Sequence, residues 1–132
     1  MKRTPLTRKT PLKAKKARTP AQKLTDKADA LWRAKVKARD QVCQKCGYDS
    51  TLEAHHIIKR WNLSTRWNVD NGILLCRDCH RRGPHSAHND EAGFAEWINR
   101  ILGEEQITKL LLETVRHGSK TVQEWIDELK GD

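Results

Sequence analysis

Two Cys-x-x-Cys pairs constrain the fold of this 132-residue chain more than any other feature. They are Cys43/Cys46 and Cys76/Cys79. Each such turn offers two thiolates, and two turns can complete the tetrahedral shell that a structural zinc ion prefers. A redox-active pair is the alternative, but such a pair usually occurs once, after a strand of a thioredoxin-like unit. The sequence therefore predicts a structural zinc site with four cysteine ligands that joins two distant segments.

The charge of the chain is distributed very unevenly. The net charge is +9, and residues 1–25 carry nine Lys/Arg and no acidic residue. Residues 26–82 have 12 basic and 7 acidic residues. Residues 83–132 have 5 basic and 10 acidic residues. A basic arm on a zinc-centred domain points to a polyanionic partner, most simply nucleic acid.

Residues 1–25 have low complexity, with Thr-Pro steps ending at prolines 5, 11 and 20. Dense like charge and proline predict a disordered basic arm that contacts phosphates, with a solubilising tail as the alternative. One domain is expected over residues 26–132, with a core at 41–88 and a helical extension at 89–130. No apolar run reaches the length of a membrane span or a signal peptide, so we expect an intracellular protein with no membrane partner.

The apolar pattern predicts an α+β, mostly helical chain. A helix starting at Thr25 or Asp26 should precede strands at 51–58 and 71–75. A helix carrying Cys79 and His80 should follow Cys76 and break at Gly83-Pro84. Further helices are expected at 90–102, 104–117 and 122–130, the last behind a Thr121-x-x-Glu124 capping box, with their apolar stripes used for packing.

Three histidines lie between or directly beside the two cysteine pairs in the sequence. His55 and His56 end the first predicted strand, and His80 directly follows Cys79. Adjacent side chains on a strand face opposite sides, so one of the paired histidines can turn to a metal while the other faces a substrate. This arrangement predicts a second, open metal site beside the zinc.

The segments Glu53-Ala54-His55-His56-Ile57 and Asn71-Gly72-Ile73-Leu74-Leu75-Cys76-Arg77-Asp78-Cys79-His80 together resemble the HNH endonuclease family. That family has a ββα-metal core, also called the His-Me finger. The Cys43/Cys46 pair is similar to its zinc-bearing branch, and the small HNH proteins of bacteriophages and prophages are the most similar in pattern.

The resemblance implies a role for each matched position. His56 would be the general base and Asn71 would orient the histidine loop. His55 and His80 would bind a catalytic divalent ion, which could be Mg²⁺, Mn²⁺, Ni²⁺ or Zn²⁺. A third ligand would come from His85 or His88, and we choose His85.

The segment between the two strands is basic and aromatic. Lys59, Arg60 and Arg66 are predicted to contact phosphates. Trp61 and Trp67 either stack on bases or, as we expect, anchor the loop in the core. Glu53 either assists the metal or pairs with an arginine, and we favour the arginine.

The resemblance implies a metal-dependent endonuclease that hydrolyses DNA phosphodiester bonds and leaves 5′-phosphate and 3′-hydroxyl ends. We expect low sequence specificity, double-stranded or branched DNA as substrate, and a place with the nucleoid in the cytoplasm of a bacterial host. A phage setting would add recombination or packaging proteins as partners. The alternatives are a non-catalytic zinc module that binds nucleic acid, and an interaction protein that docks a partner on its acidic helices.

Overall fold

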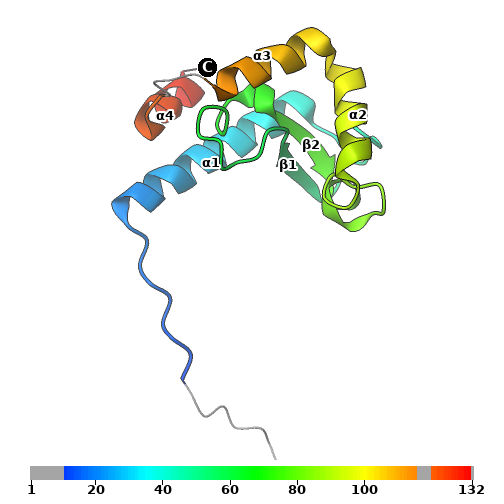
Figure 1. Ribbon diagram of the computed structural model, residues 1–132. Coiled ribbons are helices and arrows are strands. Elements are labelled where there is room, and N and C mark those ends of the chain that lie inside the picture. The colour runs from blue at the N-terminus through cyan, green and yellow to red at the C-terminus, as the bar shows by residue number, and fades with distance from the viewer. Residues whose placement is uncertain (1–10, 116–119, 132) are drawn as a thin grey trace, which may run out of the picture.

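The structure is a computed structural model that describes residues 11–115 and 120–131 (Figure 1). It has helices and one antiparallel sheet of two strands, as the predicted α+β class requires. The elements in chain order are α1 (Pro20–Asp40), β1 (Leu52–His56), η1 (Val69–Asn71), β2 (Gly72–Cys76), η2 (Asp78–Arg82), α2 (Glu91–Leu102), α3 (Glu104–Thr114) and α4 (Val122–Lys130). In the part of the chain that is described, no helix combines the length and apolar character needed to cross a membrane.

Helix α1 begins at Pro20, so the predicted start at Thr25 or Asp26 is wrong. Thr19 caps the helix, since its side chain accepts from the Gln22 backbone N–H while the Gln22 side chain accepts from the Thr19 N–H. Proline lacks a backbone donor but is favoured at the first helical position, where that donor has no partner. The basic arm, predicted over residues 1–25, can therefore include only residues that precede the cap at Thr19. Residues 11–19 are exposed and have no regular structure, and residues 1–10 lie outside the described part of the chain.

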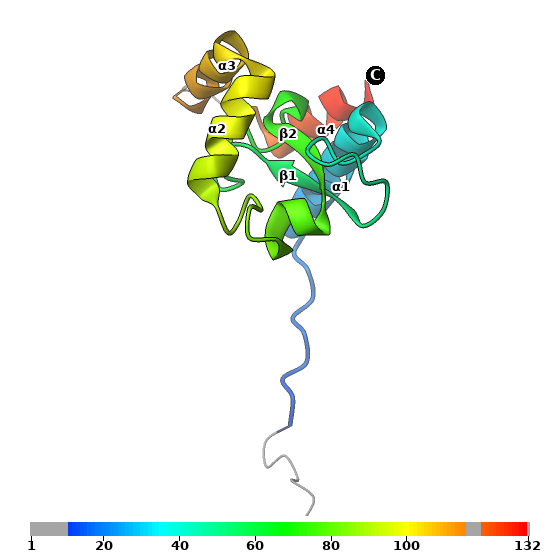
Figure 2. The same ribbon diagram turned by 90° about the vertical axis from the view of Figure 1, so that its right-hand side faces the viewer.

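The hairpin of β1 and β2 lies between α1 and α2 (Figure 2). Its register pairs Leu52 with Cys76 and His56 with Gly72. Leu74 packs into a core with α1 and α4, whereas Ile73 and Leu75 pack into a second core with α2. Both faces of the sheet are therefore covered, and successive residues of each strand enter different environments.

The helices after the hairpin form close to their predicted positions, but they pack unequally. Thr121 and Glu124 form the predicted capping box of α4, whose buried residues are Trp125, Ile126 and Leu129. In α3 only Leu110 is buried, while Leu111 and the C-cap residue Val115 are 55% and 70% exposed. The prediction that the whole apolar stripe of this helix is used for packing is therefore wrong, and residues 116 and 117 of the predicted helix lie outside the described part of the chain.

The hairpin approaches α1 so closely that residue 72 has no room for a side chain. A Cβ atom added at Gly72 would lie 2.5 Å from Val36 Cγ2 and 2.7 Å from Trp32 Cζ2. Glycine is thus required here by the close approach of a strand to a helix.

We predict that Gly72→Ala lowers the free energy of unfolding by roughly 1–3 kcal/mol, because the methyl group forces Trp32 and Val36 to shift. Denaturant unfolding of the zinc-loaded protein measures this change. Gly131→Ala is the matched control, since its Cβ would meet only ordinary contacts at 3.4 and 3.5 Å. Equal stability of the two variants would contradict the close packing of β2 against α1.

Candidate metal centre and active site

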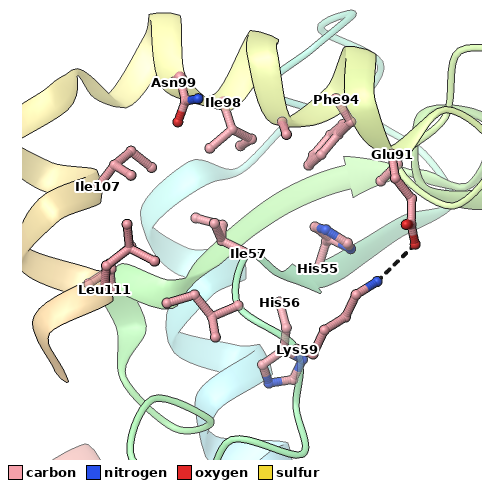
Figure 3. Close-up of a pocket in the computed structure, with 14 residues that line it drawn as sticks. His55, His56, Ile57, Lys59, Glu91, Phe94, Ile98, Asn99, Ile107 and Leu111 are labelled. Carbon is pink, nitrogen blue, oxygen red and sulfur yellow. Dashed lines mark hydrogen bonds and ion pairs between the residues drawn. The ribbon is translucent and has the colours of Figure 1, made fainter. Parts of the chain in front are cut away.

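His55 and His56 point to opposite faces of the hairpin, as predicted. The ring of His55 lies edge-on to Phe94 of α2 at a centroid distance of 5.0 Å. The ring of His56 stacks on Trp32 of α1, with centroids 3.9 Å apart and planes 5° from parallel. Figure 3 shows the same divergence, with His55 directed toward α2 and His56 away from it.

Three imidazoles gather on the His55 side. The nitrogen atoms that His55, His80 and His88 can offer lie within 4.8 Å of one another. The Nε2 atoms of His80 and His88 are 3.1 Å apart. Burial, followed by the electrostatic influence of the neighbouring His80 and His88, lowers the pKa of His55 to about 3. The His55 ring therefore stays neutral and keeps a lone pair for a metal ion.

The third imidazole is His88, and the choice of His85 was wrong. The His85 side chain is 86% exposed, and its Nδ1 lies 3.9 Å from Asp90 Oδ2. After η2 the chain turns back, so that the backbone N–H of Ala87 donates to Cys79 O and that of His88 donates to His80 O. This return places residue 88 beside residue 80 and leaves residue 85 at the outer tip of the turn.

Glu53 orients His80, a contact that sequence reasoning did not assign. Its Oε1 lies 3.0 Å from His80 Nδ1, and Arg81 Nη2 donates to Glu53 Oε2 at 2.8 Å. Burial alone would raise the pKa of Glu53, but these hydrogen bonds hold it below its ordinary value. An ionised carboxylate only accepts, so His80 donates through Nδ1 and its Nε2 lone pair faces the cluster. The predicted arginine pair is present as well.

His56 is held with one ring nitrogen available. Its Nε2 lies 2.9 Å from the carbonyl oxygen of Arg66, and because a carbonyl only accepts, Nε2 is the protonated atom. Nδ1 of the neutral ring then carries a lone pair. Burial lowers the pKa of His56 below its ordinary value, although the bond to Arg66 opposes this shift. The neutral ring has the form that a general base needs.

Helix α1 fixes the segment that positions His56. Asp29 accepts from Nε and Nη2 of Arg66, at 3.1 and 2.8 Å, and from Nε1 of Trp67 at 2.8 Å. Trp32 Nε1 donates to Asn68 O at 2.8 Å. Trp67 is thus a core anchor, as we expected. The apolar spacing of α1 indicated that Trp32 is buried, but gave no signal of its stack with His56.

Asn71 ties the loop after β1 to the start of β2. The residue is fully buried. Its Nδ2 donates to the carbonyl oxygens of Ile58 and Thr65, and its Oδ1 accepts from the Ile58 backbone N–H at 2.7 Å. These three hydrogen bonds use most of the donors and acceptors of the buried Asn71 amide. They also fix the loop that begins directly after His56.

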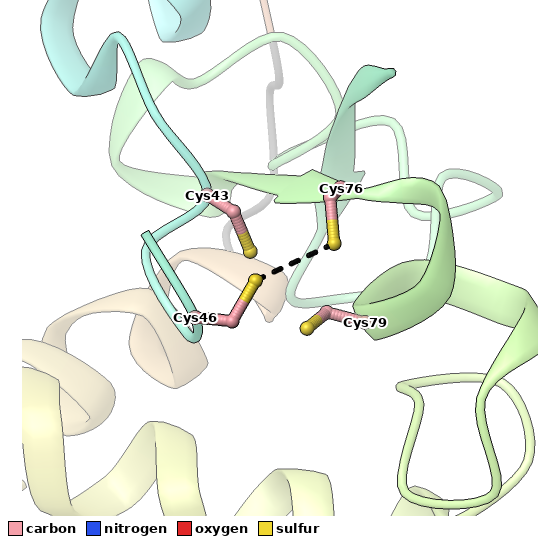
Figure 4. Close-up of side chains that lie close together, drawn as sticks. All are labelled: Cys43, Cys46, Cys76 and Cys79. Atoms are coloured by element: carbon pink, nitrogen blue, oxygen red, sulfur yellow. Dashed lines mark hydrogen bonds between the residues drawn. The ribbon is translucent and has the colours of Figure 1, made fainter. Parts of the chain in front are cut away.

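The four cysteines converge at the end of the hairpin (Figure 4). Their Sγ atoms lie within 4.8 Å of one another, with Cys46 and Cys76 at 3.6 Å. All four are free thiols. Burial alone would raise the pKa of Cys43, but backbone N–H groups of Cys76, Cys46 and Lys45 lower it to about 7. A compact set of four sulfur ligands is the donor set that structural zinc prefers.

Residues 43–85 match the family model described as HNH endonuclease. About a third of the chain is therefore similar to an HNH endonuclease domain. The four-cysteine cluster within that segment fits a zinc-bearing HNH protein. No curated protein and no solved structure matches the chain. His88 lies just beyond the matched segment, so the family match alone does not identify it.

A cleft of about 290 Å³, lined by Asp29 and by several basic side chains, reaches both His55 and His56. His55, His56, His80 and His88 all line it, together with Arg33, Lys59 and Arg60. Lys59 makes an exposed ion pair with Glu91 at 3.0 Å, and Arg60 is exposed. A second, mostly apolar groove of about 270 Å³ lies between His55, α2 and α3 (Figure 3).

The structure gives Arg66 a different contact from the predicted one. Its side chain is only 13% exposed and pairs with Asp29 through two nitrogen atoms. The residue lines the cleft, but its main contribution is to hold the carbonyl that binds His56. The neighbouring cations Lys59 and Arg60 are exposed, and Lys59 pairs with Glu91.

We predict that the four cysteines hold one zinc ion and that the stability of the fold depends on it. Removal of zinc with a chelator should lower the free energy of unfolding by about 4 kcal/mol or more, the linkage effect at a free zinc concentration about 1,000 times Kd. Metal analysis and thermal unfolding with and without chelator measure this, and Cys79→Ser should reproduce the loss. A metal-free chain with an unchanged melting temperature would disprove a structural zinc site.

Metal binding by the two histidine variants should show whether His88 or His85 is the third ligand of the second metal site. We expect His88→Ala to weaken Ni²⁺ binding to the zinc-loaded protein by more than the roughly 10–100-fold that loss of an outer-shell partner costs. His85→Ala is the matched control and should bind Ni²⁺ like the wild type. Titration calorimetry measures both, and a stronger effect of His85→Ala would restore the original choice.

Proposed function

We propose that this chain is a metal-dependent, zinc-stabilised HNH endonuclease that hydrolyses phosphodiester bonds of DNA. The observation that carries the proposal is the pair of histidine sites on one cleft. A cluster of three imidazoles lies on one side, a single imidazole with a free Nδ1 on the other, and basic side chains line the space between. In this proposal β1, β2 and η2 form the ββα-metal core of the family.

In this proposal different residues of the cleft bind the DNA, take up a proton and hold the metal ion. Arg33, Lys59 and Arg60 bind the phosphate backbone. His56 Nδ1 takes a proton from water as the water oxygen bonds to phosphorus, and the bond from phosphorus to the 3′ oxygen breaks. The products are a 5′-phosphate and, once the leaving oxygen gains a proton, a 3′-hydroxyl. A divalent ion held by His55, His80 and His88 would supply Lewis-acid stabilisation of the charge that develops on the leaving oxygen.

The residues of the site are suited to binding and cleaving the phosphate backbone, and less suited to recognising a base sequence. The cleft offers cationic side chains and imidazoles, and the short hairpin is covered on both faces, so it has no surface free to enter a groove. We therefore propose low sequence specificity. On the family resemblance we propose a phage or prophage setting in a bacterial cytoplasm, with DNA processing, recombination or packaging as the context.

Cleavage of supercoiled plasmid tests the proposal. We expect wild-type protein with Mg²⁺, Mn²⁺ or Ni²⁺ to relax or linearise the plasmid, and EDTA to stop the reaction. His56→Ala should reduce the rate by about 100–10,000-fold, the usual contribution of a general base.

The control for this experiment is His85→Ala, which should cleave at the wild-type rate. Zinc content and thermal unfolding show whether His56→Ala remains folded without the stack on Trp32. A folded His56→Ala protein that cleaves normally would rule out the assigned base. Wild-type protein that binds DNA but never cleaves it would favour the non-catalytic zinc module.

A further inference from the structure

Trp61 differs from the other tryptophans near the cleft. Its side chain is 76% exposed, whereas Trp32 and Trp67 are 1% and 2% exposed. The expectation that Trp61 anchors the loop in the core is therefore wrong. A single exposed apolar side chain is common on protein surfaces, so the surroundings of the ring decide whether it marks a binding site.

Hydrogen bonds connect the residues of the loop that carries Trp61. Asn62 N–H donates to Lys59 O, and the N–H groups of Thr65 and Arg66 both donate to Asn62 O. The Asn62 side chain accepts from the Ser64 N–H. Asn71 holds both ends of the loop through Ile58 and Thr65. The exposed indole thus lies on a hydrogen-bonded turn, and ordering of the turn before binding reduces the entropy that is lost when a ligand stacks on it.

The surroundings of Trp61 favour a polyanionic ligand over an apolar protein surface. Residues 57–67 contain Lys59, Arg60 and Arg66 but no acidic residue. Arg60, the direct neighbour of Trp61, lines the cleft with His55 and His56. Trp61 follows Arg60 directly in the chain, so a strand whose phosphate contacts Arg60 would pass close to the residue that carries the indole.

We propose that Trp61 is a nucleobase-binding site that stacks on an unpaired base next to the phosphate in the cleft. Stacking on an aromatic side chain tolerates any base, and it requires a base that is not already stacked in a duplex. The protein should then prefer DNA with a bulge, a branch or a single-stranded segment over uniform duplex. This inference rests on the proposed function, because it takes the cleft to be the site that holds the DNA backbone.

The test compares binding of three DNAs of the same sequence: a perfect duplex, a duplex with one bulged 2-aminopurine, and the single strand. Zinc-loaded protein is used without added Mg²⁺, Mn²⁺ or Ni²⁺, and affinity is measured by fluorescence anisotropy. We expect Trp61→Ala to weaken binding to the bulged DNA about tenfold, within the range of one lost stacking contact, and to change duplex binding less than twofold. Wild-type protein should also quench the 2-aminopurine, and Trp61→Ala should not.

Two further variants of the same loop show whether a loss of affinity comes from the missing aromatic ring. Leu63, also on the loop and 55% exposed, provides the matched substitution, and Leu63→Ala should leave all three affinities unchanged. Trp61→Phe should recover most of the affinity for the bulged DNA, since a phenyl ring can still stack. Because the indole is exposed, Trp61→Ala should keep the melting temperature of the wild type.

The outcomes separate this inference from the proposed function. If wild type binds DNA but Trp61→Ala binds the bulged and duplex forms as the wild type does, or loses both equally, the stacking site is ruled out and the nuclease proposal stands. If wild-type protein binds none of the three DNAs, the proposed function itself fails, and the base-stacking site fails with it.

Discussion

The alternation of side chains along β1 is the constraint on which the site depends. His55 and His56 are neighbours in the chain, yet a strand directs their rings to opposite faces. Each face is covered by a different helix, with Phe94 of α2 against one ring and Trp32 of α1 against the other. A shift of the hairpin register by one residue would exchange the two rings and destroy both arrangements. The close approach of Gly72 to α1 opposes that shift.

Helix α1 does more than cover one face of the hairpin. Asp29 binds Arg66 and Trp67, and Arg66 in turn presents the carbonyl that holds His56 Nε2. Trp32 supports the same imidazole by stacking on the face of its ring. The position and tautomer of His56 are therefore set by a helix that lies outside the segment matched by the family model. Asp29 also lines the cleft, and substitutions there would act on His56 through these contacts.

Much of this arrangement could be predicted from the sequence, because spacing carries direct geometric information. Two Cys-x-x-Cys turns predict convergence of four thiols, and adjacent histidines on a strand predict divergence. Other features depended on long-range contacts that spacing does not encode. His85 and His88 are both close to His80 in the chain, and only the backbone bonds from Ala87 and His88 to η2 select His88. The start of α1 was missed for a local reason, since Pro20 can either break or begin a helix.

The two metal-ligand clusters are coupled through the short segment η2. Cys79 and His80 are consecutive residues, so a metal ion at the cysteines fixes the backbone that presents His80. The other two imidazoles come from β1 and from the loop after η2, and that loop is itself held by the carbonyls of Cys79 and His80. The three-histidine cluster therefore exists only while η2 keeps its place at the end of the hairpin. A metal in the cysteine cluster thus stabilises the geometry of the second site although none of its ligands is shared with it.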